Sequence, residues 1–249
     1  MDTIKKKIKW VWKYVWSLIK ISIPSTIIYA CAGAILMMLT MKGDESLKWD
    51  TAKLGWTALA WVMGIGYNVA AAYSQGIIGY DMLASGNMQR RAEDRGMSMR
   101  IGQYKEEQEY RPWKGFVAGV LTAIIPVLFA LLFGAKSDII NNALTSTESP
   151  TDTSVGMTVL FGFLLSGCTL LPAFYLNASS IPFNYYLTAL FALVPILVTG
   201  FAYIGGAYGK RNKVLRAQEK KSAELEAKQN KQAKVNYGGL PGTKPKKRK

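Results

Sequence analysis

Residues 115–134 read GFVAGVLTAIIPVLFALLFG, twenty residues without a single Asp, Glu, Lys or Arg. A helix of this length rises about 30 Å at about 1.5 Å per residue, which matches the thickness of the hydrocarbon core of a bilayer. A buried helix of a soluble protein rarely stays uncharged over such a length. The stretch therefore predicts a membrane-spanning helix.

Four other stretches share this property, and together the five decide the fold class. The uncharged apolar segments cover residues 21–41, 54–76, 115–134, 155–176 and 183–208. We expect an all-α fold, a polytopic transmembrane helix bundle over residues 21–208 with about five apolar segments. A cytoplasmic stretch is expected at 77–114, and a basic tail at 209–249 that is first helical and then disordered.

Residues 1–20, MDTIKKKIKWVWKYVWSLIK, predict an amphipathic helix that lies in the membrane interface. Apolar side chains recur at helical spacing on one face: Ile4, Ile8, Val11, Trp12, Val15, Leu18 and Ile19. Polar side chains recur on the other: Lys6, Lys9, Lys13, Ser17 and Lys20. Lysines combined with tryptophans are typical of interfacial helices. A signal peptide is disfavoured, because the apolar segment that follows is too long and lacks a convincing cleavage site.

Small residues at four-residue spacing predict where helices pack closely. The expected packing positions are Gly66 and Ala70, then Gly115, Gly119 and Ala123, and finally Gly162 and Ser166. The same spacing serves packing within one chain or within a homo-oligomer. Packing within the chain is the favoured interpretation, and a homo-oligomer stays open.

The distribution of Lys and Arg assigns sides of the membrane. The N-terminal segment carries six basic residues, the 77–114 stretch seven, and the tail fourteen against three acidic ones. An N-terminus inside the cell places the 77–114 stretch inside too, but five complete crossings would put the basic tail outside. We therefore expect one segment in the 155–208 region to be re-entrant or interfacial, with the C-terminus cytoplasmic. A true five-span protein is the alternative.

The composition argues against an enzyme. The chain has no His, which excludes a Ser-His-Asp triad, a Cys-His pair and a His-ligated zinc. Cys31 and Cys168 both lie within apolar segments. No ordered carboxylate motif accompanies Asp81, Glu93 and Asp94, so a solvated loop is expected there. We expect no catalytic residue, no cofactor and no metal.

The tail ends in Lys244-Pro-Lys-Lys-Arg-Lys249, a basic run that attracts anionic lipid headgroups or RNA phosphates. The residues expected to contact lipid or RNA come from both ends of the chain: Lys6, Lys9, Lys13, Lys20, Lys244, Lys246, Lys247, Arg248 and Lys249.

The stretches AYSQGIIGYDM (72–82), EYRPWKGF (109–116) and NYGGLPGTKPKKRK (236–249) resemble multi-pass membrane proteins of Gram-positive bacteria that have no assigned activity. The resemblance implies a bacterial plasma membrane and no catalytic residue.

Two functions remain open from the sequence. The first is a non-catalytic scaffold or assembly accessory whose basic cytoplasmic ends contact anionic lipid, a partner complex or ribosomal RNA. The alternative is a component of a transporter or channel for a neutral small molecule, since no Asp, Glu, Lys or Arg lies within the apolar segments.

Overall fold

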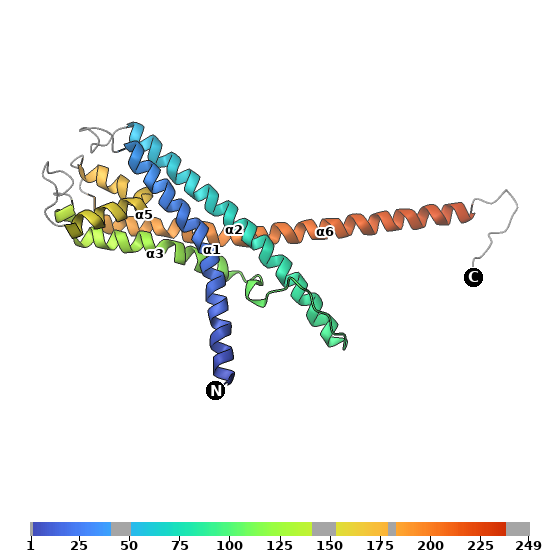
Figure 1. The fold of residues 1–249 in the computed structure, drawn as a ribbon. Coiled ribbons are helices and arrows are strands. Elements are labelled where there is room, and N and C mark those ends of the chain that lie inside the picture. The colour runs from blue at the N-terminus through green and yellow to red at the C-terminus, as the bar shows by residue number, and fades with distance from the viewer. Residues whose placement is uncertain (1, 41–50, 141–152, 179–182, 238–249) are drawn as a thin grey trace. The chain divides into compact units, whose positions relative to one another are not determined.

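The computed structural model describes residues 2–40, 51–140, 153–178 and 183–237 of the chain, and over these it is helical without strands. The elements are α1 (Asp2–Thr40), α2 (Thr51–Asp94), η1 (Glu106–Gln108), α3 (Trp113–Ala135), α5 (Thr153–Ala178), η2 (Tyr185–Ala192) and α6 (Leu193–Tyr237) (Figure 1). The all-α fold expected from the sequence is confirmed.

Four segments in the described ranges are long and apolar enough to cross a membrane: Ile8–Met38, Trp113–Ala135, Ser154–Asn177 and Tyr185–Lys231. They cover most or all of four of the five apolar segments expected from the sequence. The fifth, 54–76, lies in α2, which is not among them. Its apolar residues alternate with glycines and with polar groups such as Asn68 and Gln75, and these lower its mean hydropathy.

The chain divides into two compact units, Met1–Ala207 and Tyr208–Lys249. The second unit begins within α6, and its described side chains from Arg211 to Lys231 are almost all exposed. Lys, Arg, Gln, Glu and Ala dominate this part of α6, and they favour a helix without tertiary support.

Within the first unit, α3 and α6 pack as antiparallel neighbours. A Cβ atom on Gly115 would lie 2.6 Å from Cβ of Tyr203, and one on Gly119 would lie 2.7 Å from Cα of Ile196. Residues later in α3 thus contact residues earlier in α6, as expected for an antiparallel pair. Tyr203 lies at the end of the unit where α3 begins, together with Tyr110, whose ring stacks on it at 5.4 Å.

Helix α5 folds back on itself, as Figure 1 shows, because its backbone breaks at Ser166 (φ −135°, ψ 16°). The rings of Phe163 and Phe174 lie 5.6 Å apart, whereas positions eleven residues apart in a continuous helix are separated by about 16 Å along its axis. The fold-back lies in the 155–208 region, where the charge distribution predicts a re-entrant or interfacial segment as one of two alternatives. The break falls at Ser166, while Pro172 lies inside the second half.

The turn of α5 packs against the C-terminal third of α1. Gly33 of α1 would carry a Cβ atom only 3.0 Å from the backbone nitrogen of Gly167. Both halves of α5 contribute side chains to one apolar core, which also contains Leu36, Phe133, Ile140 and Tyr185.

Asn177 connects the end of α5 to the chain that follows it. Its side chain donates to the Phe183 carbonyl at 3.0 Å and accepts from the Phe183 N–H at 2.7 Å.

At the opposite end, α2 continues far beyond the apolar segment and stops at Asp94. Gly96 adopts a left-handed conformation (φ +72°), and the N–H of Met97 donates back to the Ala92 carbonyl at 2.8 Å. This is a Schellman-type ending, which requires a residue without a Cβ atom at the left-handed position. The chain then reverses and runs back along α2 toward α3.

Helix α1 is continuous from Asp2 to Thr40, whereas the sequence predicted a separate interfacial helix over residues 1–20. Ile8, Val11, Trp12 and Val15 are exposed. Only Leu18 of the predicted apolar face is buried among the described side chains of residues 8–20. Pro24 lies inside α1 and has no N–H to donate within the helix.

Candidate functional site

A cleft of about 350 Å³ opens at the end of the first unit where α1, α2, η1 and α3 meet. We call it the basic cleft. Its walls come from five parts of the chain: Lys13, Trp16, Ser17, Lys20 and Ile21; Gln75, Ile78 and Gly79; Lys105, Glu107 and Gln108; Lys114; and Tyr203. Four lysines thus face a single glutamate, which gives the cleft an excess of positive charge.

Lys114 is the buried lysine of the basic cleft. It is only 1% exposed, and its ammonium group donates to the carbonyl oxygens of Glu107 (2.9 Å) and Glu109 (2.6 Å). It also lies 4.8 Å from the centre of the Tyr14 ring, a cation–π distance. These partners carry no formal charge, so they satisfy the ammonium donors without neutralising the positive charge.

Tyr14 joins the N-terminal part of α1 to the start of α3. Its ring contacts those of Trp10 at 5.4 Å and Trp113 at 5.7 Å, and Arg111 lies 5.9 Å from its centre. This part of α1 is thereby held beside the 107–114 segment. Ser17 adds a contact, with its Oγ 3.2 Å from the Glu107 carbonyl oxygen. The cleft is therefore formed by side chains that contacts within the first unit hold in place.

A second polar cluster holds the returning chain against α2. Glu109 is buried, accepts a hydrogen bond from Tyr104 at 2.7 Å, and pairs with Arg90 of α2. The Tyr110 N–H donates to the Gly79 carbonyl at 3.0 Å. At Gly86 a Cβ atom would meet the ring of Tyr104 at 2.7 Å, so the close approach requires glycine there. We call Arg90, Tyr104 and Glu109 the latch.

The latch changes the acid–base behaviour of two of its members. The Glu109 carboxylate is the main reason that the pKa of Arg90 lies above its usual value. Burial is the main cause that raises the pKa of Tyr104, and its hydrogen bond to Glu109 acts in the same direction. Both shifts favour the protonation states that maintain the latch at neutral pH.

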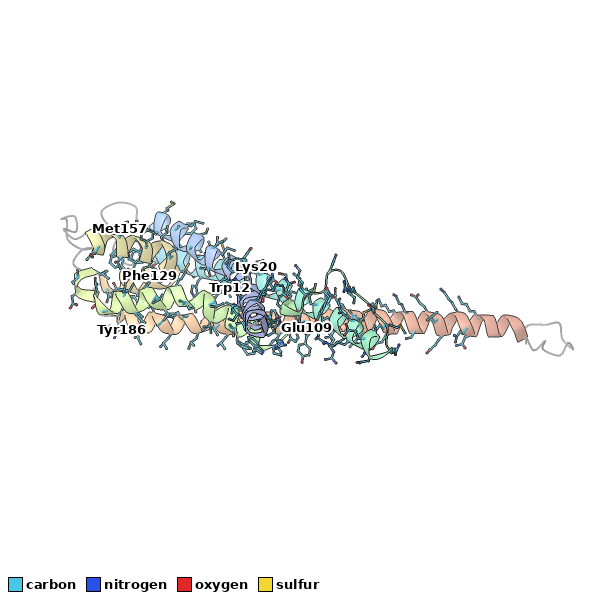
Figure 2. The ribbon with its side chains drawn as sticks, turned by 60° about the horizontal axis from the view of Figure 1, so that its bottom comes forward. Trp12, Lys20, Glu109, Phe129, Met157 and Tyr186 are labelled. Carbon is cyan, nitrogen blue, oxygen red and sulfur yellow. The ribbon has the colours of Figure 1, made fainter. Side chains whose placement is uncertain are left out.

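The lysines expected to contact lipid or RNA are only partly within the described residues. Lys9, Lys13 and Lys20 are exposed, and two of them, Lys13 and Lys20, line the basic cleft. Figure 2 shows Trp12, Lys20 and Glu109 toward one end of the first unit, and Met157 and Tyr186 toward the other. The Lys6 side chain lies outside the described residues, as do Lys244, Lys246, Lys247, Arg248 and Lys249.

The expected packing positions fall into two groups. Gly115, Gly119 and Ala123 are buried, and the two glycines face α6. Gly162 faces the Phe133 ring and Ser166 is the break in α5.

Gly66 and Ala70 are instead exposed, and a Cβ atom on Gly66 would meet nothing within 4 Å. The buried face of α2 is offset from these two positions and contains Gly64, Asn68, Ala72, Gly76 and Gly79. Close packing of α2 occurs at Gly76, where a Cβ atom would collide with the Tyr203 carbonyl oxygen.

Sequence reasoning missed three residues that shape the site: Tyr14, Glu109 and Lys114. It treated the 77–114 stretch as solvated, whereas Glu109 and Lys114 are both buried. One available signal was the concentration of aromatic and basic residues in EYRPWK (109–114), directly before an apolar segment. Residues of this kind at a membrane boundary are often held in place by neighbouring helices.

The described residues contain no group of three or more His, Cys, Asp or Glu side chains that could hold a metal. Comparison with protein families, curated proteins and solved structures found no match to this chain.

Proposed function

We propose that the chain is a non-catalytic protein of the bacterial plasma membrane, with both termini in the cytoplasm. In this topology α1, α3 and α6 cross the membrane, and so does α2, whose 54–76 segment has a lower mean hydropathy but contains no Asp, Glu, Lys or Arg. Helix α5 enters from the outer side, turns at Ser166 and leaves on the same side. Four crossings bring the basic N-terminus, the 77–114 stretch and the basic tail to one side, as the positive-inside rule favours.

Two observations support this topology. Each half of α5 is too short to cross the hydrocarbon core, because thirteen residues precede Ser166 and twelve follow it, which corresponds to about 18–20 Å. In addition, Tyr203 of α6 lies beside Gly79 of α2 and Gly115 of α3. All three residues lie at the end of the first unit that contains the basic cleft.

We further propose that the protein acts as a scaffold or assembly accessory whose basic end contacts anionic groups at the cytoplasmic surface. These groups belong to lipid headgroups, a partner complex or ribosomal RNA. The observation that carries this proposal is the basic cleft, in which four lysines from α1, α3 and the 105–108 segment face one glutamate. Charge of one sign, gathered at a protein surface, attracts anionic partners from solution or from the membrane.

The test is recovery of the tagged full-length protein from membranes solubilised in a mild detergent. We expect a stoichiometric partner or RNA at low salt that is released at high salt, because exposed charges are screened over about 8–10 Å near physiological ionic strength. A variant with Lys210, Lys213, Lys220 and Lys221 replaced by Gln tests the contribution of the tail. Recovery of the protein alone at low salt contradicts the scaffold proposal.

A transporter or channel component is the second candidate, favoured by three buried polar side chains. Asn68 of α2, Ser166 at the turn of α5 and Thr199 of α6 have no hydrogen-bond partner among the described residues. Unpartnered polar groups in an apolar interior are costly, and water or a polar solute would satisfy them. Proteoliposomes that conduct water or a small neutral solute, and lose this conductance upon Asn68→Leu, would support this candidate. Conductance equal to that of empty liposomes would contradict it.

A further inference from the structure

The basic cleft lies where the helices pass from charged to apolar sequence. Lys20 is the last charge before the apolar segment of α1, and Lys114 is the last before that of α3. On α2, Gln75 lines the cleft at the end of the 54–76 segment. In the proposed topology, these positions lie at the level of the lipid headgroups. Exposed Trp16 and Trp113 at this end are typical of that level.

The charges around the cleft suit a phosphate group. Lys114 supplies a positive charge that is held in place by two carbonyl oxygens. Lys13, Lys20 and Lys105 are exposed and reach the cleft from two different elements, so their long side chains can converge on one anion. Hydrogen bonds between an ammonium group and a phosphate are short and stronger than those between neutral groups.

The remaining walls suit an apolar chain. Trp16 and Ile21 of α1 and Ile78 of α2 line the same cleft as the lysines. An occupant that uses the whole cleft therefore combines a negatively charged group with hydrocarbon. A free phosphate ion would use only the lysines.

We propose that the basic cleft binds one anionic glycerophospholipid. Its phosphate lies among Lys13, Lys20 and Lys105, and its acyl chains leave along Ile21 and Ile78. This inference rests on the proposed function and narrows it from general attraction by a charged surface to a single site with one lipid bound.

The experiment uses the full-length protein in detergent and measures lipid binding by native mass spectrometry and by lipid-dependent thermal stabilisation. Phosphatidylglycerol and phosphatidylcholine are titrated separately. The cleft variant carries Lys13→Gln, Lys20→Gln and Lys105→Gln, three exposed positions whose change leaves the packed residues untouched. We expect one phosphatidylglycerol per wild-type chain, bound more tightly than phosphatidylcholine. The Kd of the cleft variant for phosphatidylglycerol should be about 10- to 100-fold higher than that of the wild-type protein, the scale for three lysines at a membrane surface.

The matched control carries Arg91→Gln, Arg95→Gln and Arg100→Gln. These residues are exposed and none of them lines the cleft, yet the change in net charge is the same. Its Kd for phosphatidylglycerol should remain within about twofold of wild type, a difference of less than 0.5 kcal/mol. Circular dichroism and the Tm without lipid confirm that both variants fold.

Three outcomes overturn the inference. Equal losses in the cleft variant and the control indicate diffuse attraction, which leaves the proposed function intact. Equal binding of the two lipids to the wild-type protein means that the charge of the headgroup is not recognised. This result also contradicts the lipid part of the proposed function. Inorganic phosphate that stabilises the lipid-free protein as strongly as phosphatidylglycerol does assigns the site to a free anion.

Discussion

Gly33 of α1 and Gly167 of α5 face each other so closely that neither position has room for a side chain. A Cβ atom on either glycine would lie 3.0 Å from a backbone atom of the other. Backbone atoms cannot move aside as a flexible side chain can, so the contact depends on both residues being glycine. It also fixes how far the turn of α5 reaches along α1.

Replacing Gly33 with Val should therefore destabilise the protein by about 1–3 kcal/mol, the usual cost of overpacking a well-packed interior. The free energy of unfolding can be measured by denaturant titration in mixed micelles. Gly66→Val is the matched control, because it makes the same chemical change within a helix at a position with nothing within 4 Å. Equal effects of the two substitutions would mean that the Gly33–Gly167 contact does not limit packing.

The two ends of α5 should be accessible from the same side of the membrane. In a variant with Cys31 and Cys168 replaced by Ala, single cysteines at Ser154 and Asn184 should both react with a membrane-impermeant maleimide applied to intact cells. Arg95→Cys should react only after the membrane is opened. If Ser154→Cys and Asn184→Cys label from opposite sides, α5 crosses the membrane completely and the tail is external.

The latch should protect the returning chain from proteolysis. Glu109→Gln removes the ion pair with Arg90 and weakens the hydrogen bond from Tyr104. The weaker hydrogen bond alone costs about 1 kcal/mol, which corresponds to about a fivefold change in the equilibrium for local opening. Trypsin cleavage at Arg95, Arg100 or Lys105 should accelerate accordingly. Glu106→Gln, at a nearby exposed glutamate, should leave the rate unchanged. Unaltered cleavage of the Glu109 variant would show that the latch does not restrain this segment.

Tyr104 should lose its proton at a higher pH than an ordinary tyrosine near pH 10. Because its pKa is raised in the folded protein, the stability it contributes is complete below pH 10. That stability disappears as pH rises through the folded pKa. The NMR titration of ring-labelled tyrosines, compared with that of Tyr104→Phe, identifies its signal. A midpoint at the ordinary value would contradict burial of the hydroxyl.

Sequence patterns predicted the all-α fold, because uncharged segments are a local property, but not the continuity of α1 or the length of α2. They could not predict which face of α2 packs. Gly66 and Ala70 have the spacing of a packing motif, but the buried face follows Asn68, Ala72 and Gly76. The choice between the two faces depends on where α6 crosses α2, and no local pattern contains this information.

For the same reason, the sequence predicts only some of the residues that line the basic cleft. Lys13 and Lys20 stood out because they share one face of a helix with clear periodicity. The EYRPWK pattern marks the segment that contains Lys114 but does not show that Lys114 itself is buried. Its burial follows from contacts with Tyr14 and with the Glu107 and Glu109 carbonyl oxygens, and the first lies one hundred residues away in sequence.

The break at Ser166 has a consequence for how the protein is made. In the proposed topology, the two half-helices of thirteen and twelve residues enter and leave the membrane on one side and do not cross it as an ordinary span. Helix α1, which carries Gly33, is synthesised before α5, so the complementary surface already exists when α5 emerges from the ribosome. The order of synthesis therefore lets the α5 hairpin settle onto α1 as soon as it is made.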